Sequence, residues 1–355
     1  ISGDSSKLYF VASRYLLPAS LVLLTISIDL KAVLRLGPKA VILFLTGTLS
    51  IVVGGPIALF AVSLIDPSVL GGAGPDEVWR GLSTVAGSWI GGGANQTAMF
   101  EVFGPSADLF SAMVAVDIVM ANLWLAFLLY GAGQSDRIDA FFKADSSAIE
   151  QLKDKLERWQ NERSRPIDFT SLSIIMALGF GLTGIGHLMA DQIAPWISQN
   201  APALRRLSLD STFFWIVLIA TTGGLAFSFT PARNLEGQGA SKIGTMLLYI
   251  LIATIGMKMN LFAIVENPVY FLIGILWILV HISLLLLVAK LIRAPFFFVA
   301  VGSQANVGGA ASAPIVASAF HPVLAPVGVL LAVLGYALGT YGAWLCGLLM
   351  QAVSM

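Results

Sequence analysis

The sequence predicts an all-α, polytopic membrane protein that is built from two repeats. Hydrophobic residues make up 57% of the 355 positions and charged residues only 11%, whereas ordinary globular domains carry roughly 25% charged residues. The mean hydropathy is +0.85, and the apolar residues form runs of about 20, the length that crosses a bilayer as a helix. One run in each half of the chain is interrupted by a glycine-rich stretch, and the two stretches resemble each other.

We expect about ten membrane spans, four before and six after a charged segment. Short stretches with charged residues, glycine or proline separate them, and Pro56 inside the second span predicts a kink. The expected spans cover about residues 11–30, 40–65, 78–102, 107–131, 168–190, 211–230, 243–264, 268–290, 294–318 and 322–350.

The charged segment 132–166 divides the chain. It holds seven Lys or Arg and seven Asp or Glu residues. Its apolar residues recur at helical spacing, which predicts an amphipathic helix in solvent or at the membrane surface; they are Ile149, Leu152, Leu156 and Trp159. The expected organisation is an N-terminal membrane repeat (1–131), this linker (132–166) and a C-terminal membrane repeat (167–355).

The two halves can be laid over each other. Thr25-Ile26 followed by Gly37-Pro38 matches Thr254-Ile255 followed by Asn267-Pro268, and each half then continues with an apolar span, the broken segment and a terminal span. The second half has two earlier spans without a counterpart in the first half. We therefore expect one or two further spans upstream of Ile1.

The orientation of the repeats is left open by the sequence. The positive-inside rule places the basic clusters 31–39 and 290–293 in the cytoplasm. Six expected crossings separate the first cluster from the equivalent loop near Lys258, which makes the repeats parallel. Paired broken helices are typical of inverted repeats instead, and one re-entrant or half-length segment would remove the conflict.

The two broken segments read GSWIGGGANQT (87–97) and GSQANVGGAASAP (302–314). Each glycine costs about 1 kcal/mol in a helix relative to alanine, so both segments predict a break in a membrane span. Paired breaks in corresponding positions are the best sequence pointer to the binding site of a transporter. The alternative is tight helix packing, because small residues also line helix interfaces in membranes.

A break exposes helix carbonyls that suit Na⁺ and helix N–H groups that suit a carboxylate or similar anion. Glycine lets the backbone approach a ligand closely, and neutral side chains add donors and acceptors. The candidate ligand-binding residues of the breaks are Ser88, Gly91, Gly92, Gly93, Asn95, Gln96, Thr97, Ser303, Gln304, Asn306, Gly308, Gly309 and Ser312.

Asp117 lies about ten residues inside an expected span, with Asn122 five residues later. A carboxylate at membrane depth is costly and is a functional candidate by default. It can ligate a coupling cation or carry a proton. The alternative is a structural carboxylate that pairs with a basic residue or bonds to Asn122.

Several classes of site are excluded or disfavoured. Basic and acidic residues balance at 20 each, so no nucleic-acid partner is indicated, and the single cysteine, Cys346, allows no disulfide within the chain. The three histidines have no ligand spacing, so we expect no transition-metal site. No Gly-Lys-Ser/Thr follows either glycine-rich run, which disfavours a nucleotide phosphate loop. We expect no enzyme and no cofactor other than Na⁺ as coupling ion.

The two breaks and the Ala-Val-Asp-x-x-x-x-Asn motif at 115–122 resemble the YjcL-like family of uncharacterised multi-pass membrane proteins over essentially the whole chain. Its members usually begin with further apolar sequence. More distantly, the paired breaks are similar to those of the sodium-coupled glutamate, citrate and bile-acid carriers and the sodium/proton antiporters. That similarity implies two crossing broken helices in a core domain that moves against a scaffold, with ligands at 88–97 and 303–312. Asp117 is followed by Ile118 rather than by a second acid, which disfavours simple proton antiport.

We therefore expect a cation-coupled secondary transporter of a small organic solute in the bacterial inner membrane. The sequence favours Na⁺ over H⁺, since the breaks offer many neutral oxygens and few titratable groups, and it favours an anionic solute. A channel is the first alternative and an intramembrane enzyme the second. The solute and the lipid bilayer are the expected partners, and a homodimer is compatible with the sequence, which does not give the oligomeric state.

Overall fold

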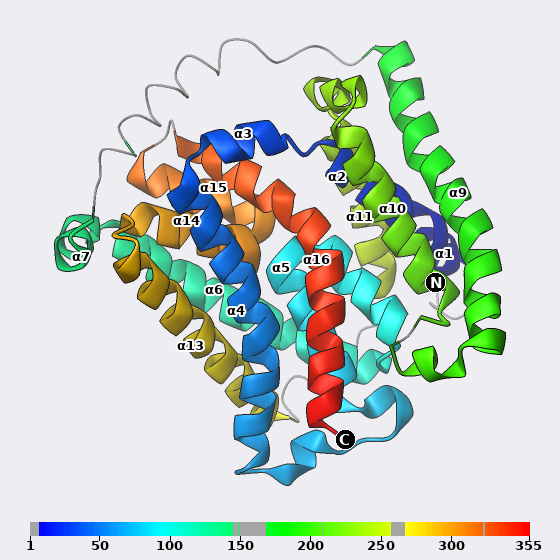
Figure 1. The fold of residues 1–355 in the computed structure, drawn as a ribbon, viewed down its shortest axis with the longest axis horizontal. Helices are drawn as coiled ribbons and strands as arrows, with labels where there is room; N and C mark the ends of the chain where they lie inside the picture. The colour runs from blue at the N-terminus through cyan, green and yellow to red at the C-terminus, as the bar shows by residue number, and fades with distance from the viewer. Residues whose placement is uncertain (1–6, 145–148, 150–167, 208, 257–266, 322–323) are drawn as a thin grey trace.

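The computed structural model describes residues 7–144, 149, 168–207, 209–256, 267–321 and 324–355. Its described residues form helices and no strand (Figure 1). The helices are α1 Leu8–Val11, α2 Leu17–Ile26, α3 Leu30–Arg35, α4 Pro38–Ser63, α5 Val78–Phe103, α6 Ala107–Ala132, α7 Ser135–Phe142, α9 Phe169–Asn200, α10 Thr212–Ser228, α11 Ala240–Gly256, α13 Pro268–Leu291, α14 Phe296–Val307, α15 Gly309–Phe320 and α16 Ala325–Val353.

Six helices in the described part are long and apolar enough to cross a membrane. A seventh span results if α10 and the 3-10 helix Pro231–Gln238, which meet at 96°, count together. These helices confirm an all-α polytopic membrane protein. The two glycine-rich segments are not among the six, so the expected ten spans include segments that do not meet the length and hydropathy of a full span. The expected span 243–264 extends beyond the described part of α11. The six are Leu8–Ile26, Pro38–Ser63, Ala107–Ala132, Phe169–Asn200, Pro268–Leu291 and Ala325–Val353.

The helices form two groups that lie side by side in Figure 1. The hairpin group consists of α4, α5, α6 and α13 to α16, and the flanking group consists of α1, α2 and α9 to α11. Helix α3 runs across one end of the molecule and joins α2 to α4. Both groups contain helices from both predicted repeats, so the halves of the sequence interlock rather than forming separate bodies.

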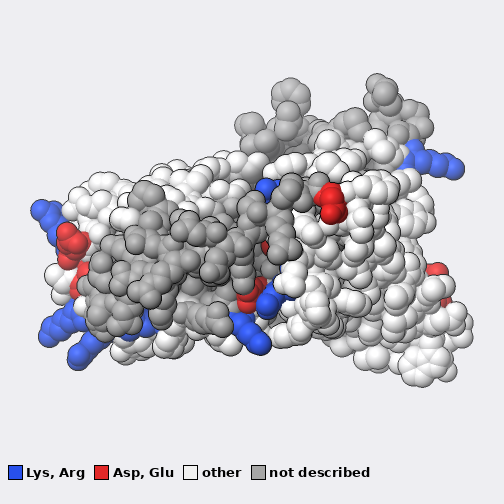
Figure 2. All heavy atoms as spheres, turned by 90° about the horizontal axis from the view of Figure 1, so that it is seen from above, with Lys and Arg blue, Asp and Glu red and all other residues white. Residues whose placement is uncertain are grey.

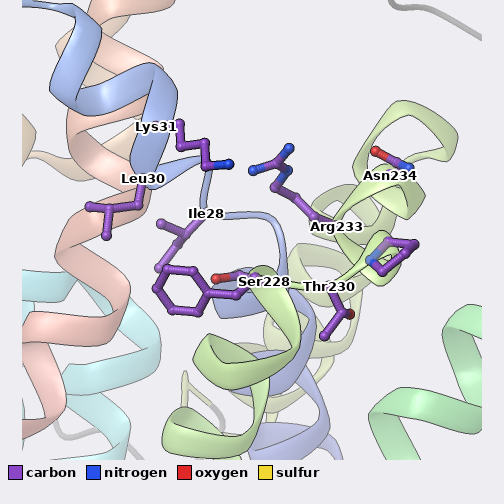
Figure 3. Close-up of a pocket in the computed structure, with 9 residues that line it drawn as sticks. Ile28, Leu30, Lys31, Ser228, Thr230, Arg233 and Asn234 are labelled. Carbon is purple, nitrogen blue, oxygen red and sulfur yellow. The ribbon is translucent and has the colours of Figure 1, made fainter.

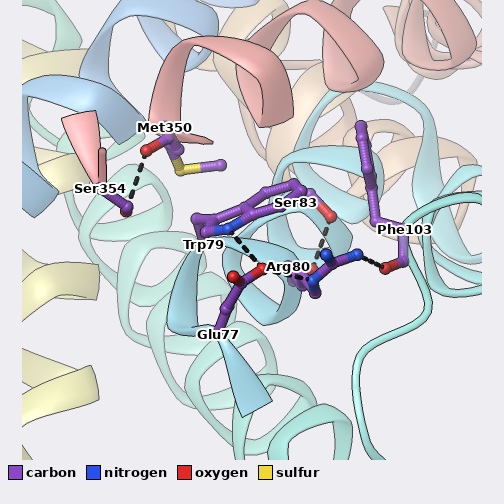
Figure 4. Close-up of polar contacts among 7 residues, drawn as sticks. All are labelled: Glu77, Trp79, Arg80, Ser83, Phe103, Met350 and Ser354. Atoms are coloured by element: carbon purple, nitrogen blue, oxygen red, sulfur yellow. Dashed lines mark hydrogen bonds and ion pairs between the residues drawn. The ribbon is translucent and has the colours of Figure 1, made fainter. Parts of the chain in front are cut away.

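Helix α5 is a hairpin whose chain direction reverses at Gly92. Gly92 has φ +74° and ψ −173°, a conformation that is essentially restricted to glycine. Near the two ends of the segment, Arg80 donates from Nη1 to the carbonyl of Phe103 at 2.6 Å, and its Nε bonds to Glu77 at 2.7 Å (Figure 4). A straight helix would separate residues 80 and 103 by about 34 Å at 1.5 Å per residue. Both ends of α5 therefore lie on the same side.

Helices α14 and α15 form the second hairpin, with its turn at Gly308 and Gly309. Gly309 has φ +59°. The ring of Phe320 at the end of α15 lies 5.3 Å from that of Phe297 at the start of α14. The two aromatic side chains can meet only because the second arm folds back along the first. The second predicted break is thus also a re-entrant hairpin rather than a continuous span.

The hairpins enter the bundle from opposite ends. Phe103 at the base of α5 packs on Gly347 near the end of α16, whereas α15 leads through residues 321–324 into the start of α16. Along α4 and α13, Gly47 faces His281 and Gly54 faces Trp277, so these matching helices are antiparallel. Helices α2 and α11 are antiparallel as well.

The antiparallel pairs resolve the open question of repeat orientation. Because α5 returns to the side from which it entered, five crossings rather than six lie between the basic cluster 31–39 and the described end of α11, namely α4, α6, α9, α10 and α11. An odd number of crossings inverts the second repeat relative to the first. The predicted amphipathic helix of the linker lies mostly in 150–167, outside the described residues, whereas α7 (Ser135–Phe142) occupies the start of the linker.

Cysteine labelling tests the re-entrant path of α5. In a Cys346→Ala background, Ala73→Cys and Ala107→Cys, which flank α5 at exposed positions, should react with a membrane-impermeant maleimide from the same side of the membrane. Leu291→Cys at the exposed end of α13 should react from the opposite side. Reaction of positions 73 and 107 from opposite sides would show that α5 crosses the membrane.

Candidate functional site

The two hairpin tips meet on the glycine-bearing face of α16. A Cβ placed on Gly335 would stand 2.6 Å from the carbonyl oxygen of Ile90 in α5 and 3.7 Å from that of Ala305 in α14. Any larger side chain at this position would push the tips apart. Since Ile90 and Ala305 both lie near the end of the first arm of their hairpin, the carbonyl ends of two short helices converge at one place in the middle of the bundle.

Asn95 fastens the tip of α5 to α16. Its Nδ2 donates to the carbonyls of Gly91 at 3.1 Å and Tyr336 at 3.0 Å. Its Oδ1 accepts a hydrogen bond from the hydroxyl of Thr340 at 2.7 Å. The side chain is fully buried, so this amide uses its polar atoms to hold the tip in place.

Asn306 fastens the second hairpin to α4 with the same pattern. Its Nδ2 donates to the carbonyls of Gly302 at 2.9 Å and Phe44 at 3.0 Å, and its Oδ1 accepts from Thr48 at 2.8 Å. Each asparagine thus bonds to the carbonyl four residues earlier and to a carbonyl and a threonine one turn apart on a long helix. The sequence predicted both as ligand-binding residues, and the structure places them at the tips with their amides bonded to protein.

Asp117 of α6 receives hydrogen bonds from both arms of the α5 hairpin. Ser88 donates to Oδ2 at 2.7 Å, Trp89 donates to Oδ1 at 2.8 Å and Gln96 donates to Oδ2 at 3.0 Å. The residue is 7% exposed. Within the described chain, no Lys or Arg forms an ion pair with it. Its carboxylate is held by neutral donors alone, which leaves a buried charge that a cation or a proton would compensate.

Gln304 is the buried polar residue of the second tip. Its Nε2 donates to Ser312 across the hairpin at 2.7 Å, while Oε1 is buried and has no hydrogen-bond partner among the residues that the structure describes. An unsatisfied buried acceptor costs about 1–3 kcal/mol. The oxygen is therefore a ready ligand for a cation or an acceptor for a donor group of a solute. Gly308 leaves the space that these two side chains occupy.

A buried series of hydrogen bonds around His281 joins the predicted residue Ser303 to three residues that the sequence analysis did not select, His281, Ser50 and Trp124. Ser50 donates to the carbonyl of Gly47 at 2.7 Å, so the His281 Nδ1–H donates to Ser50 at 2.6 Å. The other ring nitrogen then accepts from Ser303 at 2.7 Å, and Ser303 accepts from Trp124 at 2.7 Å. When the imidazole of His281 is neutral, every donor in this series of hydrogen bonds has an acceptor. The signal in the sequence was a histidine in the centre of an apolar span.

Two predicted site residues form hydrogen bonds to a carbonyl of their own helix. Asn122 is exposed and donates to the carbonyl of Ile118 in its own helix at 2.8 Å. A spacing of five residues turns it to the outer face of α6, away from Asp117. Thr97 donates to the carbonyl of Gly93 at 2.9 Å. The described residues contain no group of three or more His, Cys, Asp or Glu that could hold a metal ion.

Replacing Gly92 with alanine tests the backbone of the first tip. The only neighbour of a Cβ at this position is Tyr336 at 3.8 Å, so the cost is backbone strain of about 1–3 kcal/mol. We expect Gly92→Ala to lower the unfolding temperature of the purified protein. Gly181→Ala in α9 is the matched control, because its Cβ would meet open space in a regular helix and should leave stability equal or higher. Equal unfolding temperatures of the two variants would contradict the assigned turn.

Comparison with known proteins agrees with this architecture. A family model described as "Protein of unknown function (DUF819)" matches residues 1–353. The chain is also 24% identical over 350 residues to a Bacillus subtilis (strain 168) protein named "Uncharacterized membrane protein YjcL", and the alignment covers 95% of this chain and 82% of that protein. With both the helical membrane architecture and a family match along nearly its full length, the chain belongs to the DUF819 family of multi-pass membrane proteins.

Proposed function

We propose that the chain is a secondary transporter that couples the movement of a cation, Na⁺ in preference to H⁺, to that of a small organic anion by alternating access. The observation that carries the proposal is the meeting of two glycine-tipped hairpins, which enter from opposite ends and touch on Gly335. Small movements of the helices around such a junction can open it to one face of the membrane or to the other. Inverted repeats with paired broken segments at mid-depth are the usual construction of such carriers.

The cation side of the proposed site is formed by oxygens. The first arms of both hairpins end at the tips, and a helix C-terminus carries a partial negative charge. The carbonyls of Ile90 and Ala305 belong to these ends. Asp117, which bonds to both arms around the first tip, supplies a full charge. Neutral oxygens with one carboxylate favour a hard cation such as Na⁺ over a proton, which needs only the carboxylate.

The anionic solute is favoured by the opposite polarity of the second arms. These arms begin at the tips, so their first N–H groups and the positive end of the helix dipole face the junction. The unpartnered Oε1 of Gln304 adds one acceptor for a hydroxyl or ammonium group of the solute. A small solute with a carboxylate and a donor group fits this combination.

The interface between the two groups supports a rocking or sliding motion. On α10 of the flanking group, Thr221 lies 3.1 Å from Thr340 of α16. Because the hydroxyl of Thr340 donates to Asn95, Thr221 is the donor to Thr340. One row of hydrogen bonds therefore runs from the flanking group to the first tip, and a shift of α10 along α16 changes the support of that tip.

Asp117→Asn tests the cation site. In nanodiscs the parent protein should show a higher unfolding temperature in NaCl than in choline chloride, since a ligand that binds the folded state stabilises it by about 2.7 kcal/mol at a hundredfold excess over its Kd. Asp117→Asn should lose this difference, because the amide cannot neutralise a cation. Asp108→Asn, at an exposed position in the first turn of the same helix, is the charge-matched control and should keep it.

An unchanged response to Na⁺ in Asp117→Asn would remove this residue from the cation site.

Uptake by the protein reconstituted into liposomes distinguishes a carrier from a channel. For a carrier, uptake from a solute library should saturate and depend on an imposed Na⁺ gradient. Conduction without saturation would favour a channel.

Gln304→Leu tests the second tip. Without solute, replacing a partly unsatisfied amide with an apolar side chain of similar volume should leave the stability of the protein equal or higher. If Oε1 binds the solute, the variant should also lose the stabilisation that a transported solute confers on the parent protein. Ser318→Ala, on the same hairpin but bonded to the carbonyl of Pro314, is the control. Solute stabilisation that survives Gln304→Leu would exclude Gln304 from solute binding.

A further inference from the structure

A pocket lies where the two groups are linked. Its volume is about 310 Å³. One wall comes from the turn between α2 and α3, and the other from the turn between α10 and the 3-10 helix Pro231–Gln238 (Figure 3). The polar groups that line it include Lys31, Thr230, Arg233 and Asn234, with Ile28 and Leu30 forming the apolar part.

Two cationic side chains project toward each other across this pocket. Figure 3 shows the ammonium of Lys31 and the guanidinium of Arg233 converging from opposite walls. Arg233 also contacts Asp29 through Nη1 at 3.3 Å, and a guanidinium has further N–H donors that this one contact does not use. The residues that line the pocket include these two cations and no carboxylate. The neighbouring carboxylates have other partners: Asp29 pairs with Arg233, and Glu236 accepts from Ser27 and Ser241. Like charges that face each other are stabilised when an anion lies between them.

The pocket lies at the end of the molecule where basic residues gather. Lys39 donates to the carbonyl of Arg293 at 3.1 Å at this end, and Lys290 lies over the ring of Phe141. In Figure 2, which views the molecule from above, Lys and Arg side chains lie at the left edge and near the middle, with Asp and Glu side chains beside them. The positive-inside rule assigns this end to the cytoplasm, where phosphate groups of solutes and of lipids are both accessible.

We propose that this pocket binds a phosphate group between Lys31 and Arg233, with Arg233 as the directional donor and Lys31 as the point charge. The site is separate from the hairpin junction and does not depend on the transport proposal. The phosphate belongs either to a free anion or to the headgroup of an anionic phospholipid. Because α3 leads into α4 of the hairpin group and the opposite wall belongs to the flanking group, a bound phosphate bridges the two groups at their covalent link.

Two titrations of the full chain separate the sources of the phosphate. In detergent, inorganic phosphate should raise the unfolding temperature of the parent protein above the value in potassium chloride of equal ionic strength. In nanodiscs, phosphatidylglycerol should raise it above the value in phosphatidylcholine. Stabilisation by phosphate indicates a site for a free anion, whereas stabilisation by phosphatidylglycerol alone indicates a lipid headgroup.

Lys31→Gln is the decisive variant, because Lys31 is exposed and its replacement removes no packing. Loss of one charge-assisted contact should weaken the apparent affinity at least about tenfold. Arg233→Lys keeps the charge but loses the planar set of donors and should also weaken it. Lys242→Gln, an equal charge change at an exposed residue outside the pocket, should match the parent. The proposal is overturned if neither phosphate nor phosphatidylglycerol stabilises the parent, or if Lys31→Gln and Lys242→Gln respond equally.

Discussion

The rest of the structure depends on one constraint: the turns of the two hairpins lie inside the membrane and must be shielded from lipid by other helices. A turn at membrane depth is tolerated only where protein or a watery cavity covers it, because lipid offers no hydrogen bonds. Here α16 and α4 provide the cover. Asn95 and Asn306 each bridge their hairpin to a carbonyl and a threonine on one of these long helices. Gly335 lets both hairpins approach the same point.

This cover also organises the charge. With the first tip pressed on α16, its two arms present Ser88, Trp89 and Gln96 to one side, where Asp117 of α6 receives all three donors. The carboxylate holds the arms together and at the same time remains without a basic partner in the described structure. In the proposed transporter, the residue that stabilises the hairpin is thus also the one that binds the cation. Under this proposal, a cation that approaches Asp117 competes with the three donors that close the hairpin, so that ion binding loosens the first tip.

Much of the candidate site was predictable because its signals are local in sequence. Residue type and position along the sequence are enough to select the glycine runs, the carboxylate inside an apolar span and the small polar residues. The positions of Asn122 and His281 were not predictable in this way. Asn122 lies on the outer face of α6, and the rotation of a nearly uniformly apolar helix is set by its neighbours. His281 is connected through Ser50, Ser303 and Trp124, which come from three other helices.

The sequence by itself determined the all-helical membrane class, the two glycine-rich breaks and the burial of Asp117, because bilayer length, helix propensity and the cost of a buried charge act on each segment alone. Only the tertiary structure decided that both breaks are hairpins, since a glycine run permits a reversal but the contacts of Arg80 with Phe103 and of Phe297 with Phe320 hold it. The reversal also decided that the repeats are inverted. A hairpin returns to its own side of the membrane, whereas a continuous helix crosses it, so each hairpin lowers the number of crossings by one. Contacts between residues distant in sequence decide which of the two forms.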